Sequence, residues 1–294
     1  MKEEILNIKG VIKYNELLLK HTTFRIGGPA KVFVTPHDES DLKKVLSFAR
    51  SKGIKTFVIG RGSNLLVSDK GFDGIVIRII EPYFCDMRID GTTLTAGAGV
   101  SLSKLVVFAC QNSLGGLEGL VGIPGTAGGA LVMNAGYESM IGDRVKKVRA
   151  IDKEGKVKTF SSKSLKFGYR KSNLSEYIIT EVGFQLRRIP KTNLIKICEQ
   201  LMKLKKKTQP LDMHSAGCVF KNPQGEQFCA GEIIDFCGLK GKKVGDAEIS
   251  RRHANFIVNT KSARSKDVID LIKLVRETVK KRSGIALEQE IIVL

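Results

Sequence analysis

The 294-residue sequence contains no tryptophan, only 5 tyrosines and no long apolar run. No stretch interleaves basic with aromatic side chains, the pattern with which single-stranded nucleic-acid-binding surfaces stack bases. Helix-turn-helix, zinc-finger and RNP patterns are absent as well. No apolar segment approaches the ~20 residues that span a bilayer. From these absences we expect no nucleic-acid partner and no membrane partner.

Paired cysteines are missing too. The six cysteines show neither CxxC nor zinc-finger spacing, so we expect reduced thiols, no disulfide framework and no metal site. They are Cys85, Cys110, Cys198, Cys218, Cys229 and Cys237. The N-terminus, MKEEILNIKGVIKYNELL, carries early acidic residues and no apolar signal region, which indicates a cytoplasmic protein.

Positive charge, by contrast, is abundant. Lysine and arginine number 49 against 30 aspartate and glutamate, so the formal net charge is +19. The basic residues are spread over almost every segment, which favours a solvated basic surface over a nucleic-acid site and is compatible with a small anionic ligand. A hydrophobic content of 42% with 27% charged residues is ordinary for a globular chain. The length suggests about two or three domains.

Apolar residues at helical spacing predict several amphipathic helices. They run through Leu42–Ala49, Leu105–Ala109, Leu194–Lys207, Ala230–Cys237 and from Ser265 through Val279. Ser40 or Asp41 can cap the first helix, and Ser101 or Ser103 can start the second. Gly238 is placed to end the fourth.

Short apolar or alternating runs predict the strands. They are Thr56–Ile59, Ile75–Ile80, Leu94–Ala98, Val148–Ile151, Val157–Phe160, Ile178–Leu186, Asn255–Val258 and Ile285–Val293. The turn residues Asp152–Gly155 predict a hairpin between the fourth and fifth of these. Helices and strands mix along the whole chain, so the predicted class is α+β, in three zones covering 1–80, 81–190 and 191–294.

Glycine clusters are the most prominent local feature. They lie at 27–28, 60–62, 97–99, 122–129 and 136. Glycines let a ligand approach the backbone closely, and successive N–H groups can hold a phosphate. Gly60 and Gly62 would need a third glycine in place of Leu65 to complete the dinucleotide-binding pattern GxGxxG. The P-loop pattern GxxxxGK[ST] does not occur. Tight turns remain an alternative explanation, but the number of clusters favours a phosphate-bearing ligand.

Four side chains stand out for their chemistry. Cys218 lies among small residues in SAGCVFKNP, although a buried cysteine is usually a small hydrophobe. Glu288 and Glu290 are two residues apart in the predicted terminal strand, so both should point to one face, which could be plain polar surface. Arg170 lies in the turn-prone segment FGYRKS, where it could equally form a salt-bridged loop.

Nine motifs together point to one family. In chain order they are TTFRIGGPA (22–30), GRGSNLLV (60–67), GLEGL (116–120), GIPGTAGG (122–129), MNAG (133–136), FGYRKS (167–172), SAGCVFKNP (215–223), HANFIVN (253–259) and LEQEI (287–291). Each is weak alone, but in this order they resemble the UDP-N-acetylenolpyruvoylglucosamine reductase family, flavoenzymes of bacterial peptidoglycan precursor synthesis. The short connection between Arg170 and Cys218 is similar to that of the compact subtype of this family.

The resemblance implies an FAD-binding fold of the vanillyl-alcohol-oxidase type. Two α/β domains, 1–80 and 81–190, would hold FAD, and an α+β domain, 191–294, would bind the substrate. By the match, the loops after 59 and 121 and the short segment from 134 would line the diphosphate and the flavin. The implied FAD-lining residues are Ile59, Gly60, Arg61, Gly62, Ser63, Asn64, Leu65, Gly122, Ile123, Gly125, Thr126, Gly128, Gly129, Asn134, Ala135 and Gly136.

The resemblance also implies a reaction and its catalytic residues. NADPH would reduce the flavin, which would pass hydride to C3 of the enolpyruvyl ether of UDP-N-acetylglucosamine. Arg170 would stabilise the enolate that forms, together with Glu290, while Glu288 would be support or surface. Cys218 would protonate C2 in place of the serine of many members, since a thiol is a stronger acid than a hydroxyl.

Substrate contacts are implied as well. Asn222 and His253 match substrate-binding positions, and Tyr169 and Lys221 are weaker candidates, although His253 could equally be a core or cap histidine. We expect a monomer acting on a small-molecule substrate. Two other interpretations stay open: another FAD oxidoreductase of the same fold, and a basic nucleic-acid-binding protein.

Overall fold

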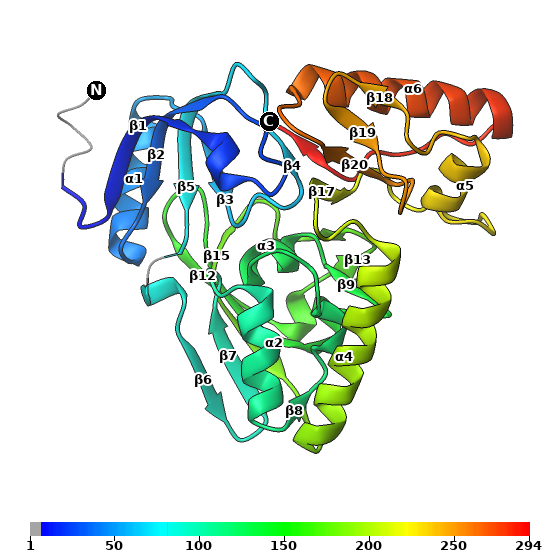
Figure 1. Cartoon of the computed structure of the whole chain (residues 1–294). Helices are drawn as coiled ribbons and strands as arrows, with labels where there is room; N and C mark the ends of the chain where they lie inside the picture. The colour runs from blue at the N-terminus through cyan, green and yellow to red at the C-terminus, as the bar shows by residue number, and fades with distance from the viewer. Residues whose placement is uncertain (1–6, 81) are drawn as a thin grey trace. The chain divides into compact units, whose positions relative to one another are not determined.

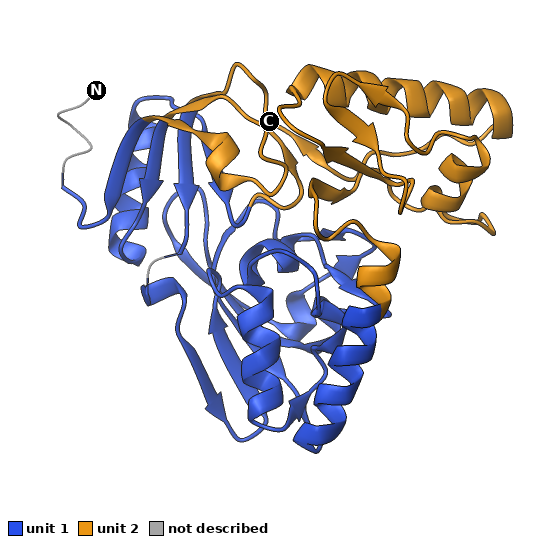
Figure 2. Ribbon diagram, in the orientation of Figure 1, with its two compact units in different colours: residues 1–14, 32–61, 74–203 blue, residues 15–31, 62–73, 204–294 orange. Residues whose placement is uncertain are grey.

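The structure, a computed structural model, describes residues 7–80 and 82–294. Residues 1–6, on which the prediction from the N-terminus partly depends, and residue 81, where the second predicted domain begins, lie outside the described residues. The chain forms two compact units that interleave in sequence (Figure 2). Unit 1 holds residues up to 14, 32–61 and 74–203, and unit 2 holds 15–31, 62–73 and 204–294. The three-domain division at 80 and 190 stays a prediction.

A four-stranded sheet of order β1-β2-β5-β3 lies mostly in unit 1. Its strands are β1 (Val11–Leu17), β2 (Pro29–Thr35), β3 (Thr56–Ile59) and β5 (Phe72–Arg78). The bounds of β3 are those predicted. The predicted strand Ile75–Ile80 is found as the later part of β5, which ends at Arg78.

Helix α1 (Glu39–Ser51) follows the sequence prediction except at its cap. Its predicted apolar face is buried. The prediction of Ser40 or Asp41 as cap is wrong: Asp38 is the N-cap, and its carboxylate accepts the main-chain N–H of Asp41 at 2.9 Å. Three neighbouring polar residues can each serve as a cap, and only the folded backbone selects one of them.

The second sheet of unit 1 is antiparallel, with order β12-β11-β15-β7-β6. Its strands are β6 (Met87–Asp90), β7 (Thr93–Gly97), β11 (Val145–Ile151), β12 (Val157–Ser161) and β15 (Ile178–Gln185). The predicted hairpin is confirmed: β11 pairs with β12, and Asp152 in the turn accepts the N–H of Lys156 at 2.7 Å.

Three helices share an apolar core with this sheet. They are α2 (Leu102–Gln111), α3 (Ala127–Val132) and α4 (Lys191–Thr208). Ser101, one of the two predicted residues, caps α2 and accepts the N–H of Lys104 at 3.3 Å. Helices α2 and α4 lie side by side (Figure 1), with the sulfurs of Cys110 and Cys198 3.7 Å apart.

Unit 2 contains an antiparallel sheet of order β17-β20-β19-β18 and two helices (Figure 1). These elements are β17 (His214–Cys218), β18 (Lys243–Val244), β19 (Ala247–Ile249), β20 (Phe256–Asn259), α5 (Ala230–Phe236) and α6 (Ser265–Ser283). The predicted start of α6 is confirmed, and its predicted apolar face is buried. Gly238 follows α5 in the left-handed conformation, as expected of a helix end. None of the helices in the described ranges has the length and apolar content that crossing a bilayer requires.

The predicted terminal strand Ile285–Val293 is mostly wrong. Only β21 (Ile292–Val293) is a strand, and it pairs in parallel with β4 (Leu65–Leu66). The remaining short strands belong to unit 1, and all have two residues. They are β8 (Leu114–Gly115), β9 (Gly136–Tyr137), β10 (Ser139–Met140), β13 (Phe167–Gly168), β14 (Lys171–Ser172) and β16 (Arg187–Arg188).

Candidate active site

The two glycine segments that the sequence assigns to a cofactor meet within unit 1. Gly60 follows β3 directly, and a Cβ added to it would lie 2.6 Å from Oγ1 of Thr126. Thr126 in turn caps α3 by accepting the N–H of Gly129 at 3.3 Å. Glycine is therefore required at residue 60 because the loop after β3 contacts the start of α3.

In the 122–129 segment, one glycine is required for packing and another leaves room for a ligand. A Cβ on Gly128 would lie 2.9 Å from Cβ of Ala98, and the N–H of Gly128 donates to the Ala98 carbonyl at 2.9 Å. Gly128 is thus needed for packing whatever the segment binds. Gly129 is exposed, and an added Cβ would meet only Oγ1 of Thr126, at 3.4 Å. The side of the segment at Gly129 has the open space that a ligand requires.

Positive charge is concentrated at the carboxyl ends of β3 and β5. The parallel register places Arg78 opposite Ile59, one residue before the Gly60 loop. Burial lowers the pKa of Arg78, and the like charge of Arg61 lowers it further. The segments 59–65 and 122–129 contain no acidic residue. The diphosphate of FAD requires N–H donors and cations around it and no neighbouring carboxylate. The residues of these segments therefore fit FAD.

Sequence reasoning missed Arg78. Its signal is a single arginine inside the apolar run GIVIRII, where a charged residue needs an explanation. Arg78 lies beside the Gly60 loop because β5 pairs in parallel with β3, and the sequence did not reveal this pairing.

Arg170 lies at the tip of a small hairpin in unit 1. Strands β13 and β14 pair through Gly168 and Lys171, which leaves Tyr169 and Arg170 as a two-residue turn. Arg170 has a φ of +54°, and its guanidinium carbon lies 5.2 Å from the centre of the Tyr169 ring. The tyrosine ring thus gives the guanidinium a cation–π contact, which restricts its orientation.

The predicted cofactor segment 134–136 is attached to this hairpin. The Asn134 side-chain nitrogen donates to the main-chain oxygen of Gly168 at 3.0 Å. Ala135 donates its N–H to the carbonyl of Ala130 at 2.8 Å, which ends α3. Gly136 lies in the β9–β10 hairpin, where a Cβ would be 2.1 Å from the Ser139 carbonyl oxygen. The structure therefore brings Asn134 and the Arg170 turn together.

Unit 2 brings Glu290 beside the end of the strand that carries Cys218. The N–H of Glu290 donates to the Val219 carbonyl at 2.8 Å. Asn64 donates its side-chain amide to the Glu290 carbonyl at 3.2 Å, and its own carbonyl accepts the N–H of Ile292 at 2.9 Å. Within one unit, Asn64 is thus bonded to Glu290, and Glu290 is bonded to Val219, the residue after Cys218.

Strand β17 is irregular just before Cys218. Its register with β20 shifts between Ser215 and Cys218, and Gly217 there has a φ of +78°. A Cβ on Gly217 would come within 4.0 Å of the Ser63 carbonyl oxygen. The irregularity thus lies near Ser63, and such irregularities often re-aim a functional side chain.

Glu288 and Glu290 do not lie in a strand, contrary to the prediction, and their exposures differ. Glu288 is exposed and forms an ion pair with Lys221, with the two atoms 2.5 Å apart, whereas Glu290 is half-buried. Regular alternation fails because residues 287–291 contact Phe220 through a single bridge instead of a continuous ladder. Lys221, a predicted substrate residue, is therefore bonded to an acidic neighbour.

Asn222 and His253 both contact the first turn of α5. Asn222 accepts the N–H of Ala230 at 3.1 Å, and a Cβ on Gly231 would lie 2.8 Å from Cε1 of His253. The His253 Nδ1 accepts the N–H of Asn255 at 3.3 Å, which places the ring proton on Nε2. Burial lowers the pKa of His253, and the charge of Lys240 lowers it further, so the ring is neutral.

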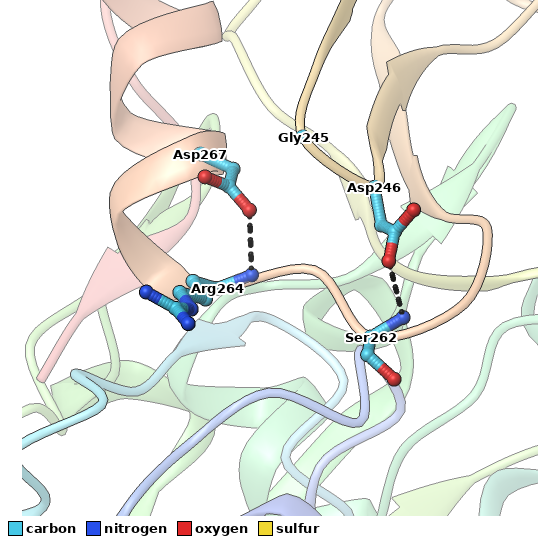
Figure 3. Close-up of a pocket in the computed structure, with 5 residues that line it drawn as sticks. All are labelled: Gly245, Asp246, Ser262, Arg264 and Asp267. Carbon is cyan, nitrogen blue, oxygen red and sulfur yellow. Dashed lines mark hydrogen bonds between the residues drawn. The ribbon is translucent and has the colours of Figure 1, made fainter.

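A surface hollow of about 390 Å³ lies elsewhere in unit 2, before α6 (Figure 3). Asp246 accepts the N–H of Ser262 at 3.2 Å, and Asp267 accepts the N–H of Arg264 at 2.9 Å. These carboxylates hold the loop that leads into the helix. None of the predicted site residues lines this hollow.

Comparisons with known proteins show which proteins the chain is similar to. A model described as "FAD binding domain" matches residues 30–161, and one described as "UDP-N-acetylenolpyruvoylglucosamine reductase, C-terminal domain" matches residues 209–294. A UDP-N-acetylenolpyruvoylglucosamine reductase of Desulforamulus reducens is 41% identical over 290 residues, which cover 98% of this chain and 95% of that protein.

Solved structures extend the comparison. The crystal structure of UDP-N-acetylenolpyruvylglucosamine reductase from Thermus caldophilus matches with a TM-score of 0.82 and 38% identity, covering 97% of this chain and 99% of that chain. A BBE-like 1 variant of Physcomitrella patens matches with a TM-score of 0.50 and 16% identity, covering 64% of this chain and 44% of that one. The second likeness concerns the fold alone. The predicted fold class, an FAD-binding fold followed by a separate C-terminal domain, is confirmed.

Proposed function

Because the chain belongs to the UDP-N-acetylenolpyruvoylglucosamine reductase family, we propose that it reduces the enolpyruvyl ether of UDP-N-acetylglucosamine to UDP-N-acetylmuramate. It is an FAD-dependent oxidoreductase of peptidoglycan precursor synthesis, with NADPH as co-substrate. The observation that carries the proposal is the link, within unit 2, between Glu290 and the end of the strand that bears Cys218. The reaction needs a hydrogen-bond donor to the developing enolate, the role proposed for Glu290, and an acid that protonates C2, the role proposed for Cys218.

The glycine segments are proposed to bind FAD. The proposed residues are the sixteen assigned above from the family motifs, and Arg78 joins them because it adds positive charge beside the Gly60 loop. When bound by these residues, FAD would supply the hydride-transfer chemistry that connects NADPH with C3 of the enolpyruvyl group. The open side at Gly129 and the absence of acidic residues in both glycine segments support this assignment.

Arg170 is proposed to bind the substrate carboxylate. As hydride reaches C3, negative charge develops on C2 and spreads into this carboxylate. A guanidinium is charged at any working pH and can bind both carboxylate oxygens, so it stabilises this charge without a proton transfer. The cation–π contact with Tyr169 supports a fixed position for the group.

Glu290 is proposed to donate a hydrogen bond to the developing enolate from its protonated form. Its main chain is held on both sides, by the Val219 carbonyl and by the Asn64 amide, so the side chain starts from a fixed backbone. Glu288 has no such position, because it is exposed and paired with Lys221.

Cys218 is proposed to protonate C2. The substrate then carries one new C–H bond at C3 from hydride and one at C2 from the thiol, and the thiolate regains its proton from solvent. The bend at Gly217 supports a directed thiol at this point. Many members of the family have a serine here, and a thiol is the stronger acid of the two.

Asn222, His253, Tyr169 and Lys221 are proposed substrate contacts. The neutral His253 imidazole carries its proton on Nε2, so it can donate to a phosphate or a carbonyl of the UDP-sugar. We further propose that the protein acts in the cytoplasm as a monomer and binds neither nucleic acid nor membrane. The large positive charge would attract the anionic substrates.

A product assay tests the function. The purified protein is incubated with FAD, NADPH and the enolpyruvyl ether, and the sugar nucleotide is identified by mass spectrometry while NADPH absorbance is followed. We expect one lactyl ether formed for each NADPH consumed. Flavin-dependent NADPH oxidation with the enolpyruvyl ether left unchanged would indicate an oxidoreductase with another substrate and would reject the proposal.

A further inference from the structure

Arg170 has a backbone conformation that residues with a side chain rarely adopt. It is the second residue of the β13–β14 turn, and its φ is +54°. A non-glycine residue keeps such a conformation when surrounding contacts fix it, often at a functional site. The contacts that hold this turn therefore determine where the guanidinium points.

The Asn134 side chain holds the strand that enters the turn. Its nitrogen donates to the Gly168 carbonyl at 3.0 Å, and its oxygen accepts the N–H of Gly142 at 3.1 Å. Asn134 is only 6% exposed, so water competes little for these bonds. A Cβ on Gly142 would lie 2.7 Å from both the Asn134 oxygen and the Phe167 ring, so the amide fits a closely packed site.

The strand that leaves the turn is tied to the same segment. Ser172 donates its hydroxyl to the Val132 carbonyl at 2.9 Å. Val132 is the last residue of α3, and Asn134 follows two residues later. Both strands of the hairpin are therefore bonded to the chain just after α3, the helix that the glycines at 122–129 lead into.

We propose that Asn134 is a positioning residue for Arg170: its buried amide sets the location of the Arg170 turn relative to the glycine segment that precedes α3. This inference rests on the proposed function. It assigns the Asn134 side chain to the protein, so the proposed contact of Asn134 with FAD is made by its main chain alone, which Asn134→Gly retains. The Ser172 hydroxyl is a second tie with the same effect.

The principal variant is Asn134→Gly. Asn134 has a φ of +44°, and glycine adopts this conformation without strain, so the variant removes the amide alone. We expect oxidation of the reduced enzyme by saturating enolpyruvyl substrate to slow by about 10²-fold, the scale on which small misplacement of a reacting group acts. Reduction of the flavin by NADPH and the affinity for FAD, measured by fluorescence quenching, should stay at the parental values.

Asn173→Ala is the matched control. The Asn173 amide also makes two main-chain bonds, to Lys166 and Ser164, each at 3.0 Å, but it closes an exposed loop. This variant should keep both half-reactions. Ser172→Ala provides the same test as Asn134→Gly through the other strand, with a slowing in the same half-reaction, and serves if Asn134→Gly does not fold.

A double-mutant cycle decides whether Asn134 acts through Arg170. If it does, Asn134→Gly causes no further slowing in an Arg170→Ala background. Multiplying effects, or a loss of FAD affinity in Asn134→Gly, would overturn the inference. A parental rate in Arg170→Ala would reject the role of Arg170 in the proposed function, whereas a slow Arg170→Ala enzyme with a parental Asn134→Gly enzyme would reject the positioning role alone.

Discussion

The Asn64 side chain donates a hydrogen bond to the main-chain oxygen of Glu290, 226 residues later in the chain, with nitrogen and oxygen 3.2 Å apart. Asn64 belongs to the loop proposed to line FAD, and Glu290 is the proposed hydrogen-bond donor to the enolate. The bond joins these two functions within unit 2, and parallel pairing of β4 with β21 continues the contact.

We predict that Glu290→Ala slows oxidation of the reduced enzyme by the enolpyruvyl substrate by about 10²–10³-fold, because a preorganised hydrogen-bond donor to the enolate is lost. NADPH should reduce the flavin at the parental rate. Stopped-flow flavin absorbance resolves the two steps. The control is Glu288→Ala, two residues away and 72% exposed on its side chain, which should leave both steps unchanged. Similar losses in the two variants would remove the special role of Glu290.

Cys218→Ala should leave flavin reduction nearly intact and slow the second half-reaction by about 10²–10⁴-fold, the range for a general acid. Cys218→Ser should retain part of the activity, because a hydroxyl can still supply the proton. Cys198→Ala, which removes a half-buried thiol in α4, is the control. Equal loss of both half-reactions in Cys218→Ala would show that the thiol is not the proton donor.

Acid should weaken the ion pair between Glu39 of α1 and Arg149 of the five-stranded sheet. Arg149 donates two bonds of 2.8 Å to the Glu39 carboxylate, and Thr180 donates a third of 2.9 Å. The hydrogen bond from Arg149 is the main cause that lowers the pKa of Glu39 below its ordinary value of 4.5, against the opposing effect of burial. The stability it contributes is therefore fully present above pH 4.5 and is lost as the pH falls through the lowered pKa.

The corresponding variant is Glu39→Gln. At pH 7 it should reduce the free energy of unfolding by about 2 kcal/mol, the scale of hydrogen bonds to charged groups. In urea unfolding followed by circular dichroism, the difference from the parent should shrink below pH 4. A difference that is the same at both pH values would mean that the ionised carboxylate contributes nothing.

The core of unit 2 offers a paired test on one helix. Leu271 of α6 is fully buried, whereas Leu274, one turn further on, is 37% exposed. Leu271→Ala should lower the free energy of unfolding by about 2–5 kcal/mol through lost burial and a cavity. Leu274→Ala should cost less than about 1 kcal/mol. Denaturant unfolding measures both, and comparable costs would contradict the packing described for α6.

The sequence correctly predicted the elements whose signals lie in neighbouring residues. The buried face of α6 and the β11–β12 hairpin were predicted because periodicity and turn residues are properties of adjacent residues. The terminal strand failed for the opposite reason. Residues 287–291 bond to Phe220 and its neighbours through isolated contacts, which no alternation in the sequence records.

In the candidate site, too, the residues in local motifs were predicted and their long-range contacts were not. Arg170, Cys218 and Glu290 were found through motif order, whereas the contacts that hold them were not. The bond from Asn134 to Gly168 spans 34 residues, and Arg78 reaches the Gly60 loop through parallel pairing. Such partners are set by tertiary structure, so the sequence pointed to the proposed reacting groups but not to the residues that contact them.

The anaerobic absorption spectrum of the purified protein tests the central claim most directly. We predict a yellow flavin band that NADPH bleaches and that one equivalent of the enolpyruvyl ether of UDP-N-acetylglucosamine restores. A protein that binds no flavin, or a bleached band that this substrate leaves unrestored, would contradict the account.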